Sequence, residues 1–571
     1  MGRGTMPGAR WVVRLASLVA LCLVADKGGA QGTPRLEDVT ASTGIHFEHL
    51  SSPEQRYIVE SMSGGVALID YDGDGWLDIY LTNAPNVAMA LAGKKARGAL
   101  YRNNHDGTFT DVTEKAGVAT PCWAMGAAVA DVTNSGRQDL LVSCFGGVVL
   151  YRNNGDGTFT DVTAKSGLAK DVGWATGVTF GDYDGDGFPD LFVPHYVDLD
   201  LNDLPKFGSV KTCQYHEIAV QCGPRGLKGS GDSLYHNNGD GTFTEVGASA
   251  GVDDKKHYFG MGAVWTDFDN DGKIDLFVAN DGETNYLYKN EGGGRFKEIG
   301  QDAGVAFSED GLEQANMGVA VGDFENKGRM SVAVSHFSDE YLALYRNEGG
   351  MNFTDVSHAV GVARGTERYV GWGDAFVDLD NSGWLDLVLV NGHVYPQVDD
   401  AKLGIHYREP GVLFRNTRDG KFKETAEAAL GVGRVSRGMA VGDLFNRGAL
   451  DLVVENLTGG PTILSSRPDQ AHHWMSLQLE GAPKNRLALN ARVKVTVGGV
   501  TQMQEVRSGG SYLSQSDLRL HFGLGAAKVA EVVEVSWPGG GTQQFRGVAG
   551  DKFYKLKQGG ELSPVVYTRA K

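Results

Sequence analysis

The chain has 571 residues, of which 81 are glycine and only 16 are proline, and 22% of its residues are charged. It is too long for one ordinary domain unless the fold is a repeat array or a propeller, and its composition is not that of a disordered protein. The net charge of -18 argues against nucleic-acid phosphates and anionic membranes, and it suits calcium binding or solubility.

Residues 1–30 are predicted to be a secretory signal peptide. Arg3, Arg10 and Arg14 supply basic charge, the apolar run WVVRLASLVALCLVA covers 11–25, and the small residues GGA precede Gln31. An uncleaved membrane anchor is the alternative, although the run is short for a span. Since no second apolar run of that length follows, we expect a secreted, periplasmic or cell-surface protein without a membrane span after cleavage.

An aspartate-rich loop of nine residues recurs seven times. Each copy follows a small, apolar strand such as GGVALID, and most precede a β-rich run such as LDIYLTN. Loops one to seven are defined as residues 70–78, 131–139, 182–190, 267–275, 323–331, 378–386 and 443–451.

A second element alternates with these loops. LYRNNHDGTFTDVT begins at Leu100, and similar stretches begin at Leu150, Leu234, Leu287, Leu344 and Leu413. Asn-Gly and Asp-Gly pairs between strands are hairpin signals, so each unit is predicted to contain four short strands. Four strands at a period of roughly 50 residues are typical of a propeller blade.

The ends of the array indicate a closed ring. RLEDVTASTG (35–44) resembles the FTDVT strand without the LYRN strand, and PTILSS (461–466) stands in the LYRN place without FTDVT after it. One blade completed by both ends would leave no open sheet edge. We therefore predict a seven-bladed β-propeller over 35–466, with an open β-solenoid as the alternative.

Two regions interrupt or follow this pattern. An insertion covers about 196–232, and from 470 to 562 alternating runs such as ARVKVTVGG predict a smaller all-β domain of the sandwich or barrel type. An even number of cysteines outside the signal segment, which contains Cys22, favours disulfides in an exported protein. Cys213–Cys222 would close a short loop and Cys122–Cys144 would span a hairpin; four free or metal-binding thiols are the alternative.

These elements resemble a known family. The loops and the LYRN/FTDVT stretches resemble FG-GAP or VCBS repeats, and HHWMSLQLEG, SGGSYLSQSD, HFGLG and SWPGGGTQQF are similar to the ASPIC/UnbV domain. Together with CQYHEIAVQCGPRG and NGHVYPQVD, they resemble the cartilage acidic protein family, which implies an extracellular calcium-binding protein. Asn490 stands where that family usually has glycine.

Spacing explains how the loops can hold calcium. Oxygens at positions one, three, five and nine can converge when the chain curls between two strands, and hard oxygen ligands without nitrogen or sulfur select calcium. A turn held by its own hydrogen bonds is the alternative for every loop. The predicted ligands are Asp70, Asp72, Asp74 and Asp78; Asp182, Asp184, Asp186 and Asp190; Asp267, Asp269, Asp271 and Asp275; and Asp378, Asp380, Ser382 and Asp386.

The remaining loops are weaker candidates. Loop two has Thr133 and Ser135 at its centre, and loops five and seven carry Lys327 and Arg447 at position five. We expect that an ion pair with Asp323 or Asp443 replaces the metal there, unless the side chains simply point into water. In each metal-binding loop calcium is expected to be structural, because a loop between adjacent strands has no groove to open.

No residue pattern identifies a catalytic site. HExxH and P-loop motifs are absent from the sequence. His393, Tyr395, Arg434 and Arg437 fall in loops of the last two blades and could form a polar ligand pocket; ordinary loop hydrogen bonding is the alternative. The leading hypothesis is a calcium-stabilised propeller that binds an extracellular protein or glycan. The alternatives are an enzyme with its site on the propeller face or at the domain junction, and a purely structural matrix component.

Overall fold

The computed structural model describes residues 1–2 and 35–568. Nearly all of the predicted signal peptide, Cys22 included, lies outside the described residues. No helix in the described part of the chain is both long and apolar enough to cross a bilayer.

Seven antiparallel sheets of four blade strands each form the propeller. Blade one contains β2 (Val66–Ile69), β3 (Asp78–Leu81), β4 (Ala99–Asn103) and β5 (Phe109–Asp111). Blade two contains β6 (Trp123–Ala130), β7 (Asp139–Phe145), β8 (Gly147–Asn153) and β9 (Phe159–Asp161). Blade three contains β10 (Thr179–Gly181), β11 (Asp190–Val193), β14 (Ser233–Asn237) and β15 (Phe243–Glu245).

Blades four to seven contain β16 (Gly260–Thr266), β17 (Asp275–Glu283), β18 (Tyr286–Gly292) and β19 (Arg295–Glu298); β21 (Val319–Gly322), β22 (Ser331–Val334), β23 (Ala343–Gly349) and β24 (Asn352–Asp355); β25 (Gly371–Val377), β26 (Asp386–Asn391), β27 (Val412–Asn416) and β28 (Phe422–Thr425); β29 (Ser436–Gly442), β30 (Asp451–Asn456), β31 (Thr462–Arg467) and β1 (Arg35–Asp38). A short strand, β20 (Gln314–Ala315), also pairs with β17.

The ring closes between the two ends of the array. β1 pairs antiparallel with β31, with Arg35 opposite Arg467 and Asp38 opposite Leu464. The outer strand of blade seven therefore comes from the start of the array, as predicted, and the closed ring replaces the open solenoid. Side chains of blades one and seven share one apolar cluster, which contains Leu68 and Val453.

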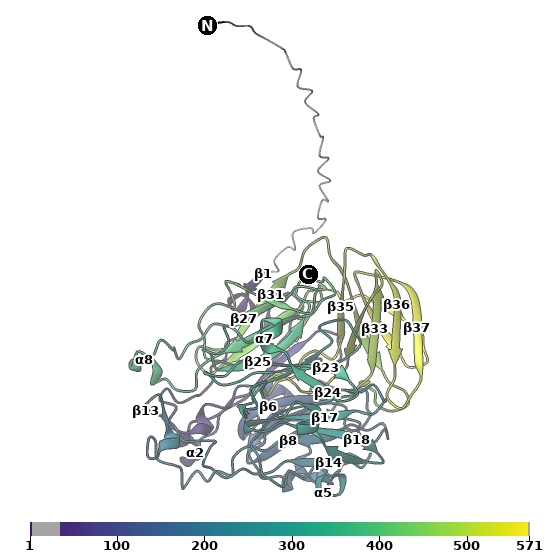
Figure 1. Ribbon diagram of the computed structural model, residues 1–571. Coiled ribbons are helices and arrows are strands. Elements are labelled where there is room, and N and C mark those ends of the chain that lie inside the picture. The colour runs from purple at the N-terminus through teal and green to yellow at the C-terminus, as the bar shows by residue number, and fades with distance from the viewer. Residues whose placement is uncertain (3–34, 569–571) are drawn as a thin grey trace.

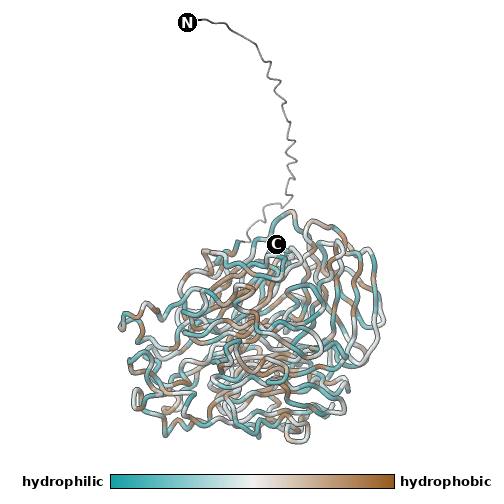
Figure 2. Tube along the Cα trace, in the orientation of Figure 1, coloured by the Kyte–Doolittle hydropathy of each residue, from teal (hydrophilic) through white to brown (hydrophobic). Residues whose placement is uncertain are grey.

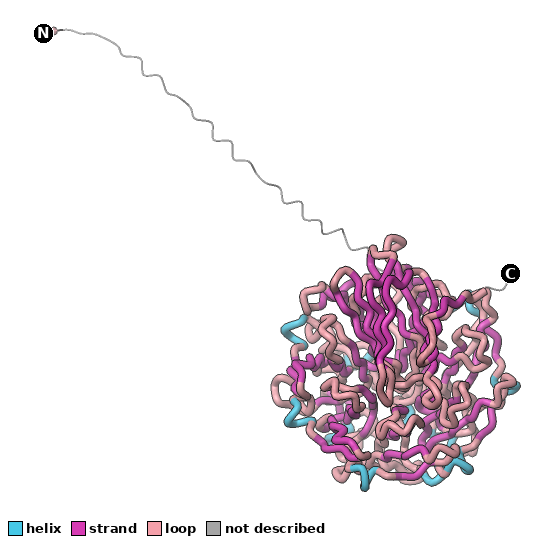
Figure 3. Tube along the Cα trace, turned by 90° about the vertical axis from the view of Figure 1, so that its right-hand side faces the viewer, coloured by secondary structure: helices cyan, strands magenta, loops and turns pink. Residues whose placement is uncertain are grey.

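Short helices lie at the rim of the propeller, where Figure 3 shows them in cyan. Six one-turn helices directly follow the outermost blade strands: α1 (Thr40–Thr43), α3 (Thr113–Ala116), α4 (Thr163–Ser166), α5 (Gly247–Ala250), α6 (Gly300–Ala303) and α7 (Ser357–Val360). α2 (Val87–Leu91) and α8 (Val398–Ala401) lie in connections between the second and third strands of their blades.

The C-terminal domain is a β-sandwich. One sheet contains β35 (Leu520–Gly525), β32 (His473–Glu480), β38 (Lys552–Lys557) and β39 (Ser563–Val565), and the other contains β34 (Val500–Glu505), β33 (Arg492–Val497), β36 (Val529–Ser536) and β37 (Thr542–Ala549). Leu477 and Phe522 of the first sheet and Val493 and Val533 of the second belong to one buried apolar cluster. This domain, yellow in Figure 1, stands beside the propeller, and apolar segments are concentrated inside both units (Figure 2).

A segment of the C-terminal domain enters the centre of the ring. Residues 507–518, here called the plug, hydrogen-bond to innermost strands of the propeller. The plug contacts are Leu68 N to Gln515 O (2.9 Å), Ala127 N to Leu513 O (3.2 Å), Thr179 Oγ1 to Ser508 O (2.7 Å), Val319 N to Ser511 O (3.0 Å), Asp374 N to Ser511 Oγ (3.1 Å) and Asp517 N to Val441 O (3.0 Å). The plug therefore links six blades to the sandwich. These contacts could not be predicted from the alternation of apolar residues in the sequence.

Candidate metal centres

The seven aspartate loops share one backbone frame. The position-one aspartate accepts a hydrogen bond from the position-six N–H in every loop, at 2.6–3.0 Å. The residue at position six is always a glycine with φ between 72° and 87°, a conformation that costs a side-chain-bearing residue strain. The curl proposed from the spacing is thus present in all seven loops, including those that lack a full set of carboxylates.

Carboxylate oxygens converge in loops one, three and four. Asp70, Asp72 and Asp78 form one group whose ligand atoms all lie within 4.8 Å of one another. Asp182, Asp184 and Asp190 form a second such group, and Asp267, Asp269 and Asp271 form a third. The predicted ligands Asp74, Asp186 and Asp275 are not members of these three groups, although Asp186 forms a further group with Asp184 and His236.

Several of these oxygens have no hydrogen-bond donor. Asp70 Oδ1, Asp72 Oδ1 and Asp182 Oδ1 are buried and unpartnered. Burial, reinforced by nearby carboxylates, raises the pKa of Asp70 to about 6 and that of Asp182 to about 7. A cation would compensate these charges, because the groups repel one another when ionised without it. An all-oxygen donor set fits calcium in loops one and four.

A side chain from the third strand of the blade reaches toward the loop. This residue precedes the asparagine of the LYRN stretch. In blade one Arg102 Nε lies 2.6 Å from Asp72 Oδ2, and in blade four Lys289 pairs with Asp269. In blade three the same place is taken by His236, whose Nδ1 lies 3.2 Å from Asp184 Oδ2 and 3.1 Å from Asp190 Oδ1.

In loop six this cation lies between the predicted ligands. The Arg415 guanidinium is 2.5 Å from Asp380 and 3.0 Å from Asp386, and the side chains of all three residues are buried. Burial would raise the pKa of Asp380, but the Arg415 charge, together with hydrogen bonds from neighbouring polar groups, holds that pKa below its usual value. The arginine thus neutralises two of the three carboxylates predicted to bind calcium at loop six, and these residues are not among the converging groups of the described chain.

Loops five and seven contain ion pairs, but with partners other than those expected. Lys327 Nζ lies 2.8 Å from Glu325 rather than at Asp323. Arg447 pairs with Asp451 at position nine rather than with Asp443. Blade seven has Ser465 opposite Asp451, whereas the third strand of blade one carries Arg102, which pairs with its loop at Asp72. Arg447 therefore supplies from the loop the cation that the third strand of blade seven lacks.

Neighbouring blades are connected by a set of buried asparagines that were not predicted from the sequence. Each is the last residue of a LYRN-type stretch, and its Nδ2 donates to the position-eight carbonyl of its own loop at 3.0–3.1 Å and to the position-two carbonyl of the preceding loop at 2.7–2.9 Å. These blade-linking asparagines are Asn103, Asn153, Asn237, Asn290, Asn347 and Asn416. Their repetition in the sequence was the available signal, but it was read only as part of a hairpin.

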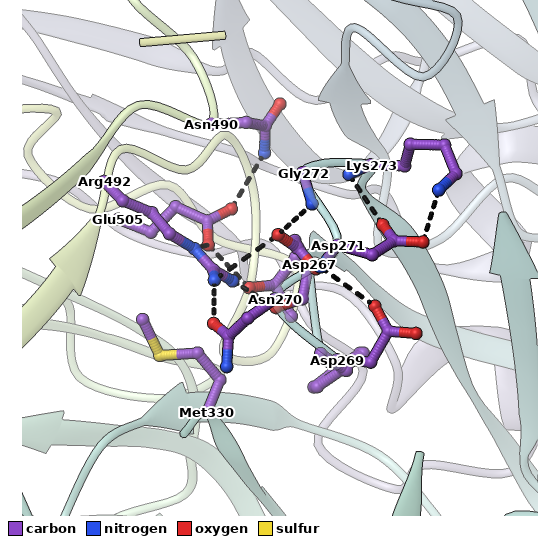
Figure 4. A network of polar contacts seen from close by, with 12 residues as sticks. Asp267, Asp269, Asn270, Asp271, Gly272, Lys273, Met330, Asn490, Arg492 and Glu505 are labelled. Carbon is purple, nitrogen blue, oxygen red and sulfur yellow. Dashed lines mark hydrogen bonds and ion pairs between the residues drawn. The ribbon is translucent and has the colours of Figure 1, made fainter. Parts of the chain in front are cut away.

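The C-terminal sandwich docks on the face that carries the aspartate loops. Figure 4 shows Arg492 beside loop four, where Nη1 lies 3.5 Å from Asp267 Oδ2 and Nε lies 3.1 Å from Glu505. Glu505 also accepts a hydrogen bond from Asn490 Nδ2 at 3.2 Å. Asn490 has φ of 66°, so it adopts the left-handed conformation that glycine takes without strain and that asparagine tolerates.

Other loops contact the same domain. Lys484 Nζ donates to the Asp186 carbonyl at 2.8 Å, and Arg519 Nη1 donates to the Gly75 carbonyl at 3.3 Å. At loop six, His472 Nδ1 lies 2.6 Å from the Asp380 carbonyl. The C-terminal domain and the residue before it therefore contact loops one, three, four and six directly.

The predicted polar pocket lies on the opposite face and is only partly assembled. His393 is fully buried, its Nδ1 accepts from the Tyr395 N–H at 3.0 Å, and the Tyr395 ring centroid lies 5.3 Å away. Arg437 donates to the Ser61, Gly392 and Ser436 carbonyls and lies over the Trp372 ring at 4.0 Å. Arg434 instead pairs with Asp38 at 2.9 Å.

These residues hold the face together. Burial lowers the pKa of His393 to about 3 and that of Arg437 to about 10, and the Arg437 bonds connect blades six and seven to the segment before blade one. The contacts of this cluster are packing and hydrogen bonds, but His393 Nε2 and Arg437 Nη2 are buried without a hydrogen-bond partner, so a ligand pocket here stays a prediction.

The insertion crosses the same face. Its hairpin, β12 (Gln214–Tyr215) and β13 (Ile218–Ala219), is closed by the Cys213–Cys222 disulfide. Tyr215 Oη lies 2.7 Å from Ser338 Oγ, and His216 pairs with Asp339 at 2.9 Å. The second disulfide, Cys122–Cys144, joins β7 to the residue before β6. Both pairs are those expected from the sequence, and disulfides are typical of extracytoplasmic proteins.

Beside the insertion lies an open groove of about 1050 Å³. Its walls come from loops of blades five and six, and they include Leu312, Glu340, Arg368 and Leu403 as well as His216. Leu312 is 62% exposed and Leu403 is 37% exposed, so the groove presents apolar as well as charged groups.

Comparison with known families agrees with this architecture. The FG-GAP-like repeat model matches residues 70–142, 133–193, 226–277, 267–334 and 378–454, which together exceed half of the chain. The chain belongs to the FG-GAP-like repeat family. Residues 481–563 of this FG-GAP protein match the ASPIC and UnbV model.

Curated relatives of the FG-GAP protein are cartilage acidic proteins. Cartilage acidic protein 1 of Mus musculus is 26% identical over 382 residues, which are 62% of this chain and 52% of the relative. Cartilage acidic protein 1 of Xenopus tropicalis is 24% identical over 549 residues, 90% of this chain and 75% of the relative. The alignments with the mouse and human proteins span about half of those relatives.

Two solved structures are among those to which the chain shows a weak similarity. An Agrocybe aegerita lectin, described as recognising non-reducing terminal N-acetylglucosamine, has a TM-score of 0.40 and 17% identity over 70% of this chain and 87% of the lectin. The N-terminal part of BBS1, in complex with ARL6, has a TM-score of 0.38 and 9% identity over 76% of this chain and 97% of that structure.

Proposed function

We propose that the FG-GAP protein is exported, that calcium stabilises its propeller, and that it binds an extracellular protein or glycan. The observation that supports calcium is the set of buried, unpartnered carboxylate oxygens in converging aspartate groups, above all Asp70 Oδ1 and Asp72 Oδ1. Two disulfides support an extracellular location.

Calcium would be structural at these loops. Asp70, Asp72 and Asp78 are positioned to hold it in blade one, and Asp267, Asp269 and Asp271 in blade four. The bound ion would supply positive charge where the chain brings carboxylates together, and Arg102 and Lys289 would remain as neighbouring cations. A ligand that binds only the folded chain raises its stability.

The groove is the proposed place for the partner. The aspartate-loop face carries the C-terminal sandwich and the plug, whereas the groove face offers exposed leucines beside carboxylates and basic side chains. The alternative is an enzyme, and a buried His393 beside carboxylates would favour it. His393 instead bonds to the Tyr395 backbone and packs against the Tyr215 and Phe337 rings.

One experiment tests both parts. The melting temperature of the full chain is measured in chelator and in calcium, and the calcium-loaded chain is screened on glycan and extracellular-protein arrays. We expect calcium to raise the melting temperature, and Leu312→Asp to abolish binding that the matched Leu91→Asp, at a leucine 56% exposed and outside the groove, preserves. Equal melting temperatures would refute structural calcium, and equal binding by both variants would refute the groove.

A further inference from the structure

Blade three differs from the other blades in the side chain that the third strand presents to the aspartate loop. Blades one, four and six present Arg102, Lys289 and Arg415, which pair with loop carboxylates. Blade three presents His236. Guanidinium and ammonium groups are cations without a lone pair for a metal, whereas a neutral imidazole nitrogen is a metal ligand.

The imidazole is placed among the ligands rather than beside them. His236 Nδ1 forms a converging group with Asp184 and Asp186, and Asp184 in turn converges with Asp182 and Asp190. The Nδ1–oxygen separations are 3.2 Å to Asp184 and 3.1 Å to Asp190. Two ligands that share one ion at about 2.0–2.2 Å are expected to lie roughly 3–3.5 Å apart.

An independent observation points to an ion at this place. Asp182, which converges with Asp184 and Asp190, is 9% exposed, and its Oδ1 has no hydrogen-bond donor. The edge of the His236 ring also faces Tyr183, at a centroid distance of 6.4 Å, so the imidazole has a packed neighbour as well as carboxylates.

We propose that loop three is a mixed nitrogen–oxygen site that selects a first-row divalent transition ion, with the converging His236, Asp184 and Asp186 as ligands and Asp182 and Asp190 within reach. Imidazole suits zinc and its neighbours in the first transition row, whereas calcium takes oxygen. The inference rests on the proposed binding of divalent ions by the aspartate loops, and it assigns one of them to a different class of metal.

The probe is Co²⁺, whose visible absorption reports its ligands. The chelator-treated full chain is titrated with Co²⁺ in the presence of excess calcium, which occupies the all-oxygen loops. We expect one equivalent of Co²⁺ with a spectrum of nitrogen–oxygen coordination. His236→Gln should weaken binding at least about tenfold, the lower end of the loss seen when only an outer-shell partner of a ligand is removed.

A matched control comes from blade one. His105 Nε2 lies 2.7 Å from Asp74, its side chain is 24% exposed against 28% for His236, and it belongs to no converging group in the described chain. His105→Gln should therefore leave the Co²⁺ titration unchanged. His236→Arg, which installs the residue present in LYRN, offers a second variant of blade three if the glutamine variant does not fold.

The outcomes separate this inference from the proposed function. Loss of the Co²⁺ site in both His236 variants, with their calcium-dependent rise in melting temperature intact, supports it. A Co²⁺ titration that is unchanged in the folded His236 variants, or complete displacement of Co²⁺ by calcium, overturns it and leaves His236 as a charge partner of the loop. Failure of the proposed calcium role would instead appear as no effect of calcium on the wild-type melting temperature.

Discussion

The blade-linking asparagines predict a large effect from a small substitution. Asn153 is 2% exposed, and its Nδ2 donates to the Tyr71 carbonyl of blade one at 2.7 Å and to the Gln138 carbonyl of its own loop at 3.0 Å. Its Oδ1 also accepts from the Gly155 N–H at 2.8 Å. Asn153→Ala removes all three bonds and leaves their partners at a junction between two blades.

The magnitude follows from the count of bonds. A hydrogen bond contributes about 1 kcal/mol net, and a buried partner left unsatisfied costs about 1–3 kcal/mol. Three bonds therefore give a loss of roughly 3 kcal/mol in the free energy of unfolding, or more if water does not reach the abandoned carbonyls. The neighbouring Asn154 is exposed, and its side chain bonds only to the side chains of Thr158 and Thr160, so Asn154→Ala should cost under about 1 kcal/mol.

Urea unfolding of both variants in saturating calcium, monitored by tryptophan fluorescence, measures the difference between their free energies of unfolding. Circular dichroism first checks that both variants are folded without urea. We expect a clearly lower urea midpoint for Asn153→Ala than for Asn154→Ala. If the two substitutions shift the midpoint equally, the asparagine bridges do not stabilise the blade junctions and the reasoning is wrong.

Two further predictions concern charge. Arg492→Gln removes a positive charge 3.5 Å from Asp267 and leaves the buried Glu505 without its ion-pair partner, so it should lower the stability of the calcium-free chain. Because the lost charge also repels a cation at loop four, calcium binding there, measured by calorimetry, should become stronger. Weaker calcium binding would contradict this. Burial raises the pKa of Glu340 to about 7. Because its pKa is higher in the folded chain than in the unfolded one, its stabilising contribution is present at low pH and is lost as the pH rises through about 7. The gain in stability of Glu340→Gln over wild type should therefore grow between pH 5 and pH 8, and a constant difference in melting temperature would refute the shift.

The propeller could be predicted from the sequence because its information is local and repeated. Each aspartate loop, with glycine at position six, fixes a turn between two strands, and the truncated units at 35–44 and 461–466 indicate closure. Ring closure then requires only that the two partial units pair, as β1 and β31 do.

The details of each site depend on contacts between segments far apart in sequence. Loop six has an acceptable set of ligands by spacing, but Arg415, 29 residues after Asp386, lies between two of them. His236 is likewise separated from loop three by the insertion, and Arg492 reaches loop four from another domain. Spacing within a nine-residue loop carries no information about these partners.

The position of the sandwich determines how chelator experiments should be read. Arg492 and Lys484 hold loops four and three through carbonyl or carboxylate oxygens of the loops themselves, and the plug bonds to innermost strands of the ring. Removal of metal from these loops should therefore loosen the sandwich and the plug as well as the blades. Loss of partner binding in chelator would follow from that loosening even if no calcium touches the partner. Leu312→Asp at saturating calcium separates the two causes, because it changes the groove and leaves the aspartate-loop face intact.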